Sequence, residues 1–524
     1  AFPHSFPVCA LTKLPSIPPL CRCPLVRAMH IPAGMSLSCQ DDRRSWPGMA
    51  TAHYLRCFVL CNAWSQAKRT GYLCPLTVDS GAPKREGSQP GEPMKITNVF
   101  TVLIAALTIL SCTKKQKGDY DLNSQETLRI NISVEPPSLD WSKSTDTTSS
   151  LITDNIMEGL VEYNYDDPNL ELLPALAKSW TPSNNAQTWT FELRKSVKWT
   201  DGIELKAQHF VDGWQRLLDP MTASEYAYFL YGVKNAKAYN EKKIKDFAQV
   251  GVRAEGDYKL VVDLVGPQSY FPYLLTHHST FPVRIDLIKK HGDKWTDPEN
   301  MVTLGPYFLK TWEHDKAIIL ERNDIYYGDK AKIKYILGYM INEMSTAINL
   351  FDKGQIDAQF NLPSTELSLL KKRPDFVESG ILMIYYYGFN VKRKPMDNPL
   401  VRKAISHAID RREITQMLAG GQVPLTSWVP PGMFGYAPEI GIEFDVKKAN
   451  ELLTRAGFKD RNKFPTIELS FNTNENHQRI AENVQSQLKK NLGINVELKN
   501  EEWKVYLNTL QVNPAHIYRM GWLA

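Results

Sequence analysis

The chain has 524 residues, enough for roughly two to four domains, and its formal net charge at pH 7 is +5. Residues 1–93 contain ten Lys and Arg and five Asp and Glu, so the chain from Met94 onward carries 52 residues of each sign. The net positive charge therefore belongs to the first 93 residues. The bulk charge of the rest gives no reason to expect a nucleic acid or an anionic membrane surface as a partner.

Residues 1–93 do not have the composition of a folded domain. They hold twelve of the 33 prolines, begin with Ala instead of Met, and contain no sustained helical or alternating pattern of apolar residues. Their closely spaced cysteine pairs, Cys21/Cys23 and Cys57/Cys61, lack the histidine partners and the second pair that a zinc module needs. We therefore interpret 1–93 as a leader that is either non-native, from translation of upstream sequence, or disordered.

Residues 94–112 have the pattern of an export signal. A lysine supplies a positive start, and the apolar run of residues 99–110 is too short to span a bilayer comfortably. The run ends at Ile109-Leu-Ser-Cys112, which resembles the lipobox of bacterial lipoproteins and predicts that Cys112 is lipidated. A buried core segment with a chance cysteine is the alternative, but the polar residues 113–126 that follow are typical of a tether.

All eight cysteines lie at or before Cys112, so the sequence beyond it offers no disulfide, thiolate metal site or cysteine nucleophile. This part also contains no Gly-x-Ser-x-Gly elbow, His-Glu-x-x-His motif, Walker loop or dinucleotide-binding glycine motif. His277 and His278 have no carboxylate residue nearby in the sequence. We therefore predict that the protein is not an enzyme and uses neither a metal nor a cofactor.

Apolar residues in the body of the chain follow the two periods of strands and helices in an order typical of an α/β protein. Alternation predicts strands at 128–132, 189–193, 260–264 and 318–320. Helical spacing predicts helices at 152–160, with Gly159 near the end, and at 210–218. Turns are expected at 135–137, 199–202 and 303–307.

The second half of the chain has clear helix-start signals. A helix is expected from Ser345 to Gly354, another begins where Asn398 precedes Pro399, and residues 410–413 have a capping-box arrangement. Further on, the pattern predicts a strand at 467–471, a helix at 480–492 and a strand at 494–498. These three form a βαβ unit with parallel strands and a right-handed crossover.

Several phrases of the sequence resemble one family: Glu135-Pro-Pro-Ser-Leu-Asp140, Glu158-Gly-Leu160, Trp189-Thr-Phe-Glu-Leu-Arg194, Trp199-Thr-Asp-Gly202, Gly305-Pro-Tyr307, Val401-Arg-Lys-Ala-Ile405 and Ala408-Ile-Asp-Arg411. The chain is similar, from about Leu128 to its last residue, to the oligopeptide-binding proteins of peptide ABC importers. The phrases occur in the family's order with few shifts, so they are specific for the family and less specific for the ligand.

The resemblance implies an α/β fold of the periplasmic-binding-protein type (class II), with two hinged lobes and an extra α/β lobe inserted in the first. It assigns 127–160 and 281–382 to the base lobe, 161–280 to the inserted lobe and 383–524 to the second ligand lobe. In relatives, the residue that follows the position of Ala524 is the aspartate that pairs with the peptide's α-amine. The resemblance therefore also implies a second lobe that is incomplete at a truncated C-terminus.

The implied function is capture of short peptides between the closing lobes and delivery to a membrane permease. A peptide of arbitrary sequence offers only its backbone and charged ends as constant features, so the site should pair its backbone like an added strand and supply charges for its ends. The implied partners are the ABC permease and ATPase subunits and the membrane through the lipid anchor. We expect an exported monomer, facing the periplasm or cell exterior, that binds no nucleic acid.

Two alternatives remain open at this point. Relatives bind other solutes on the same fold, such as a nickel chelate, haem or a sugar. The other alternative is an adhesive surface lipoprotein, and only a ligand screen would distinguish it from a solute-binding protein.

The resemblance also implies site residues. Tyr226 aligns with a tyrosine that contacts the peptide, Trp503 and Trp522 align with tryptophans that wall the pockets, and His477 and Arg519 align with cationic residues near the peptide's carboxyl end. Each has a structural alternative, because the tryptophans could be core residues, His477 could cap a helix and Arg519 could form a structural ion pair.

The sequence departs from the enteric relatives at two positions near this site. Gly388 stands where those relatives carry Glu, and Leu510 stands where they carry Arg. Loss of both charged residues implies a different preference for peptide length or side chains.

Overall fold

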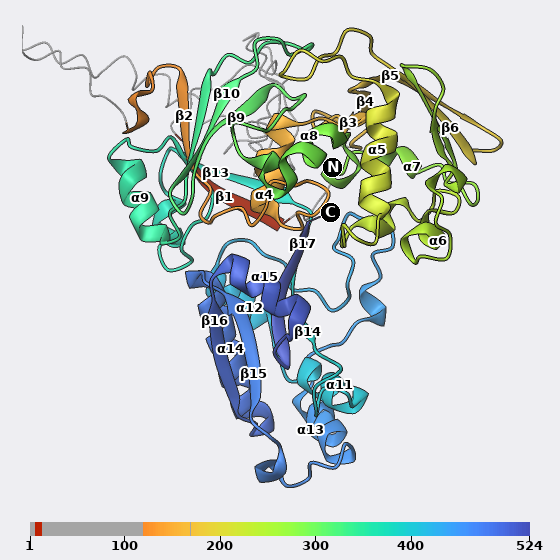
Figure 1. Ribbon diagram of the computed structural model, residues 1–524. Coiled ribbons are helices and arrows are strands. Elements are labelled where there is room, and N and C mark those ends of the chain that lie inside the picture. Colours follow the sequence, from red (N-terminus) through yellow and green to blue (C-terminus); the bar gives the residue numbers. More distant parts are fainter. Residues whose placement is uncertain (1–5, 13–118, 168, 524) are drawn as a thin grey trace, which may run out of the picture. The chain divides into compact units, whose positions relative to one another are not determined.

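The computed structural model describes residues 6–12, 119–167 and 169–523, drawn as ribbons in Figure 1. Among these residues, no helix combines the length and the apolar character needed to cross a membrane. The predicted export signal at 94–112, with Cys112, lies outside the described residues, as do most of the predicted leader and residues 113–118 of the predicted tether.

The largest sheet has seven strands in the order β13-β1-β12-β2-β11-β10-β9. Their bounds, in that order, are Phe376–Ile381, Phe6–Thr12, Ala358–Gln359, Thr127–Asn131, Tyr335–Tyr339, Ala317–Arg322 and Tyr307–Glu313. β2 is parallel to both β12 and β11, and the remaining pairs are antiparallel. The apolar residues of β2 and β10 are buried, as expected for strands in the interior of a sheet.

Strand β1 comes from the start of the chain, for which the sequence analysis predicts no regular structure. It runs antiparallel to β13 from Phe6 opposite Ile381 to Leu11 opposite Phe376, and it also pairs with β12. The prediction is wrong for Phe6–Thr12. A strand is held by backbone hydrogen bonds to its neighbours and can form without an apolar pattern of its own.

A second sheet, entirely antiparallel, has the order β5-β6-β8-β7. Its strands are Ala177–Ser183, Thr188–Leu193, Lys259–Asp263 and Val252–Ala254. A two-stranded sheet, β3 (Val161–Tyr163) with β4 (Leu172–Pro174), precedes it in the chain.

The third sheet has the order β14-β17-β15-β16 and positions most of the residues discussed below. Its strands are Met383–Phe389, Ile517–Leu523, Ile467–Asn472 and Val496–Glu501. β15 is parallel to β16 and to β17, and β14 is antiparallel to β17. β13 ends at Ile381 and β14 begins at Met383, so the chain passes from the first sheet to the third across Leu382 alone.

The α-helices of the described residues keep the labels of Figure 1. They are α4 (Thr147–Ile156), α5 (Ala207–Leu218), α6 (Ala236–Asn240), α7 (Phe271–Leu274), α8 (Ile285–His291), α9 (Met344–Asp352), α10 (Leu367–Leu370), α11 (Pro399–His407), α12 (Arg411–Leu418), α13 (Val446–Arg455), α14 (Glu475–Leu492) and α15 (Trp503–Val512). Short 3-10 helices are η1 (Asp119–Asp121), η2 (Ala227–Leu230), η3 (Phe247–Gln249), η4 (His278–Thr280), η5 (Gly292–Thr296), η6 (Pro438–Ile440) and η7 (Arg461–Lys463).

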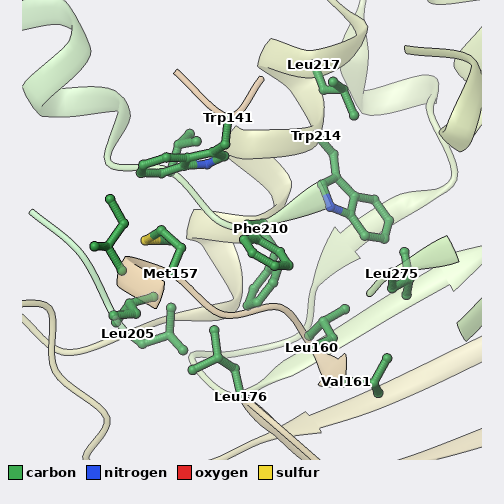
Figure 2. Packing of buried hydrophobic residues seen from close by; sticks show 14 of the residues in the cluster. Trp141, Met157, Leu160, Val161, Leu176, Leu205, Phe210, Trp214, Leu217 and Leu275 are labelled. Atoms are coloured by element: carbon green, nitrogen blue, oxygen red, sulfur yellow. The ribbon is translucent and has the colours of Figure 1, made fainter. Parts of the chain in front are cut away.

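One hydrophobic cluster runs through the first and second sheets, and another lies under the third. Figure 2 shows the first cluster around α5, where the rings of Phe210 and Trp214 lie near Leu160 and Leu275. The apolar stripe predicted for 210–218 is thus buried, as its helical spacing requires. Because the cluster is continuous, the residues predicted as base and inserted lobes share one core.

The local signals in the sequence are largely confirmed. Asn398 caps α11 through its side chain and Pro399 is the first residue of that helix. Asp410 caps α12, and the 467–498 segment forms β15, α14 and β16 with the two strands parallel. Capping residues and periodicity act over a few residues, so the sequence alone is enough to locate these elements.

The predicted end of α4 at Leu160 is wrong, because the helix ends at Ile156 and Met157 is already extended. Tertiary contacts hold the chain in this conformation. The carbonyl of Ile156 accepts the N–H of Gly305 at 2.8 Å. The Glu158 carboxylate accepts the hydroxyl of Tyr327 at 2.6 Å and that of Tyr326.

Candidate functional site

The third sheet leaves one edge of β17 open. β17 pairs with β14 along its whole length, but with β15 only at Ile517 and Tyr518. The strands then separate around the hydroxyl of Tyr506, which lies 3.1 Å from the carbonyl oxygen of Ser470 and 2.7 Å from that of Arg519. Within the described residues, the outer edge of 520–523 has no backbone partner. Such an edge offers N–H and C=O groups to an extended chain.

Arg519 lies at the start of this open edge and is buried, with 8% of its surface exposed. Its Nη1 donates to Oδ1 of Asn472 at 3.1 Å, and its guanidinium carbon lies 4.8 Å from the ring centre of Tyr385. Its Nε has no hydrogen-bond partner, and it forms no ion pair with any described residue. A buried arginine is normally paired with an acid, so this one is placed to receive an anion from outside the chain.

His477 lies in the first turn of α14, close to Arg519. The side chain of Asn474 caps the helix by accepting the N–H groups of Asn476 and His477, so the imidazole is not needed as a cap. Its Nδ1 is buried without a partner, and its ring centre is 5.5 Å from that of Tyr385. Burial, with a smaller contribution from the charge of Arg519, lowers the pKa of His477 well below its ordinary value, so the ring is neutral at neutral pH.

Two tyrosines of β14 complete this polar group. The hydroxyls of Tyr385 and Tyr387 are buried and make no hydrogen bond of regular geometry, although both lie close to Arg519. Burial raises the pKa of each phenol, so both remain protonated and able to donate. Donors around an unpaired arginine are the groups that a carboxylate requires.

Tyr226 and Trp522 meet across elements that are far apart in sequence. Tyr226 directly precedes η2, and its hydroxyl donates to the carbonyl of Thr145 at 3.3 Å. Its ring centre is 6.3 Å from that of Trp522 in β17, with the planes nearly perpendicular. Trp522 is 41% exposed, so it is not a core residue.

Trp503 is the first residue of α15. Its indole N–H lies 3.5 Å from Oδ1 of Asp146, the residue that caps α4, and its ring is stacked 6.2 Å from Tyr506. Burial is the main cause that raises the pKa of Asp146, while hydrogen bonds from the helix N-terminus and Ser149 oppose it. Trp503 therefore connects the third sheet to the start of α4.

His277 and His278 pack against the ring of Tyr226. The ring of His277 lies 4.7 Å from that of Tyr226, edge on, and is stacked 4.2 Å from that of His278. Burial lowers the pKa of His278 to about 4 and that of His277 well below its ordinary value, so both rings are uncharged at neutral pH. They act as aromatic packing residues.

The structure brings Arg519 and His477 together, and it separately brings Tyr226 and Trp522 together. The indole of Trp503 approaches Asp146. Tyr385 and Tyr387 are not among the site residues predicted from the sequence. Three consecutive tyrosines in a strand are the signal that could have found them, because alternation directs the first and third to one face.

The mixed sheets, with the chain passing from one to the next through Leu382, fit a two-lobed class II binding protein. The family model of bacterial extracellular solute-binding proteins, family 5 (middle region), matches residues 171–524. The chain belongs to this family of solute-binding proteins, and the predicted fold class is confirmed.

The relatives include peptide-binding proteins. The chain is 36% identical over 440 residues to the oligopeptide-binding protein OppA of Bacillus subtilis, covering 81% of this chain and 80% of that protein. A periplasmic oligopeptide-binding protein of Borrelia burgdorferi has a similar crystal structure, with a TM-score of 0.71, 35% identity and coverage of 76% and 79%. Haemophilus influenzae OppA in complex with RPPGFSPFR gives a TM-score of 0.68, 32% identity and coverage of 77% and 81%.

Proposed function

We propose that the protein is the solute-binding component of an ABC importer, which captures short peptides and delivers them to a membrane permease with its ATPase subunits. The observation that carries this proposal is the open edge of β17 beside the buried, unpaired Arg519. An extended chain with an anionic end matches both features at once. The names and bound peptide of the relatives support peptides over a nickel chelate, haem or a sugar.

In this mechanism the peptide backbone adds to the edge at 520–523 as another strand. Main-chain hydrogen bonds then provide affinity that does not depend on peptide sequence. The peptide's carboxylate accepts hydrogen bonds from Arg519, from the hydroxyls of Tyr385 and Tyr387, and from a neutral His477 when its proton is on the nitrogen that faces the ligand.

Closure of the site uses the short passage at Leu382 as a hinge. The contacts of Trp503 with Asp146 and of Trp522 with Tyr226 join elements on either side of that passage. We propose that, when the two lobes are closed, these aromatic residues form the walls of side-chain pockets. Water in the pockets supplies adaptable hydrogen bonds. Such pockets accept varied side chains.

Calorimetry on the full-length protein tests this function. Alanine peptides of two to six residues should bind, with similar affinity when their side chains are varied at most positions, because the main chain and the ends provide the common contacts. Nickel chelates, haem and simple sugars serve as the comparison ligands. Binding of one of these with no heat from any peptide would overturn the proposal.

We also propose that the protein is exported and held at a membrane as a monomer by a lipid on Cys112, as the lipobox pattern indicates. Cells fed a clickable fatty-acid analogue should label the wild-type protein and not the Cys112→Ser variant. Ser111→Ala, which retains the cysteine and a small residue before it, is the matched control and should still be labelled. Label that persists in Cys112→Ser, or none in the wild type, would contradict the anchor.

A further inference from the structure

Gly388 and Tyr518 form an unusually close pair in the third sheet. They are directly opposite each other in β14 and β17. A Cβ placed on Gly388 would lie 2.4 Å from Cζ and 2.7 Å from Oη of Tyr518, closer than real Cβ contacts. The ring of Tyr518 therefore occupies the space beside the backbone of Gly388, and it can do so only because residue 388 has no side chain.

Tyr518 is part of a larger aromatic surface. Tyr386 is two residues before Gly388, so it projects from the same face of the sheet as Tyr518. The ring of Tyr386 lies 4.7 Å from that of Trp428, at 59° between the planes, and Trp428 is 58% exposed. We name these three residues, Tyr386, Trp428 and Tyr518, the aromatic wall.

The two strands that carry Tyr386 and Tyr518 contain no acidic residue. β14 and β17 contain no Asp or Glu, and their one charged residue is Arg519. Alternation directs Arg519 to the opposite face of β17 from Tyr518. Among the described residues, the hydroxyls of Tyr386 and Tyr518 have no hydrogen-bond partner, and both side chains are half-buried. The wall thus presents ring surface with a polar rim, and the two strands that carry Tyr386 and Tyr518 contribute no carboxylate that could pair with a basic side chain.

The following inference rests on the proposed function. A peptide strand added at 520–523 directs alternate side chains to the face that carries Tyr518 and Trp522. We propose that the aromatic wall receives one of these side chains, that it selects an aromatic one, and that Tyr518 is the residue that determines this preference. Ring-on-ring packing in offset or edge-on geometry favours an aromatic side chain over alanine beyond the area it buries.

The test measures the affinity of full-length protein for tetra-alanine and for tetrapeptides with one Phe or one Lys at each position. In the wild type, Phe at one position should raise the affinity about tenfold over alanine, and Lys there should give no gain. Tyr518→Ala should abolish the gain from Phe and leave the affinity for tetra-alanine unchanged. Tyr270→Ala, which removes an exposed tyrosine near the second sheet, is the matched control and should change neither value.

Gly388→Ala provides an independent variant, because its Cβ must displace the ring of Tyr518. Introduced into the wild-type protein, Gly388→Ala should reduce the gain in affinity from Phe. Introduced into the Tyr518→Ala variant, it should have no further effect. Circular dichroism should verify that each variant is folded. A gain from Phe that survives Tyr518→Ala, an equal gain from Lys, or an equal loss for tetra-alanine would overturn the inference. Absence of binding by every peptide would instead refute the proposed function.

Discussion

Replacing Arg519 with methionine is expected to weaken binding of a free-acid tetrapeptide by a hundredfold or more. Arg519 is buried, lacks an ion pair among the described residues and has an unsatisfied Nε, so the peptide's carboxylate is its expected partner. Removing one member of a buried charge pair costs about 3–5 kcal/mol. Each 1.4 kcal/mol corresponds to about a tenfold change in affinity, and calorimetry on the wild type and variant measures the loss directly.

An amidated peptide is the control for this variant. The wild type should lose a similar factor when the peptide's carboxylate is amidated, and Arg519→Met should barely distinguish the acid from the amide. Thermal stability without ligand should not fall, because the arginine pays a desolvation penalty with no ion pair in return. Equal affinity of the wild type for acid and amide would remove Arg519 from carboxylate recognition.

Replacing Asp140 with alanine should lower the free energy of unfolding by about 3–5 kcal/mol, because it leaves a buried guanidinium without its partner. Asp140 accepts two hydrogen bonds from Arg216 of α5, at 2.8 Å and 2.5 Å, and both side chains are about one-tenth exposed. The guanidinium also lies 5.8 Å from the ring centre of Trp295. Urea unfolding followed by circular dichroism measures the change.

A second variant separates the loss of the pair from the loss of packing. Asp140→Leu combined with Arg216→Met should recover most of the stability, since an apolar pair of similar volume removes both buried charges. Asp257→Ala, which breaks an exposed ion pair with Lys206, is the control and should change unfolding little. A loss as large for Asp257→Ala as for Asp140→Ala would contradict the argument from burial.

The five site residues are predicted from the resemblance to the family. The structure shows how the strand order places them in space. Arg519 and His477 are 42 residues apart in sequence and come together because β17 lies beside β15, which leads into α14. That strand order cannot be predicted from the composition or the periodicity of any one segment. Alternation in the run of three tyrosines places Tyr385 and Tyr387 on one face of β14, but their proximity to Arg519 depends on the antiparallel register of β14 with β17.

What the sequence determined by itself is local. The cap and proline at Asn398-Pro399, the stripe of α5 and the parallel unit from 467 to 498 depend on residues within a few turns of one another, where backbone geometry relates neighbours directly. Only the tertiary structure decided the end of α4 at Ile156, the separation of β15 from β17 around Tyr506, and the ring of Tyr518 over Gly388. Each of these depends on contacts between segments distant in sequence, and such contacts follow from the register and packing of the whole chain.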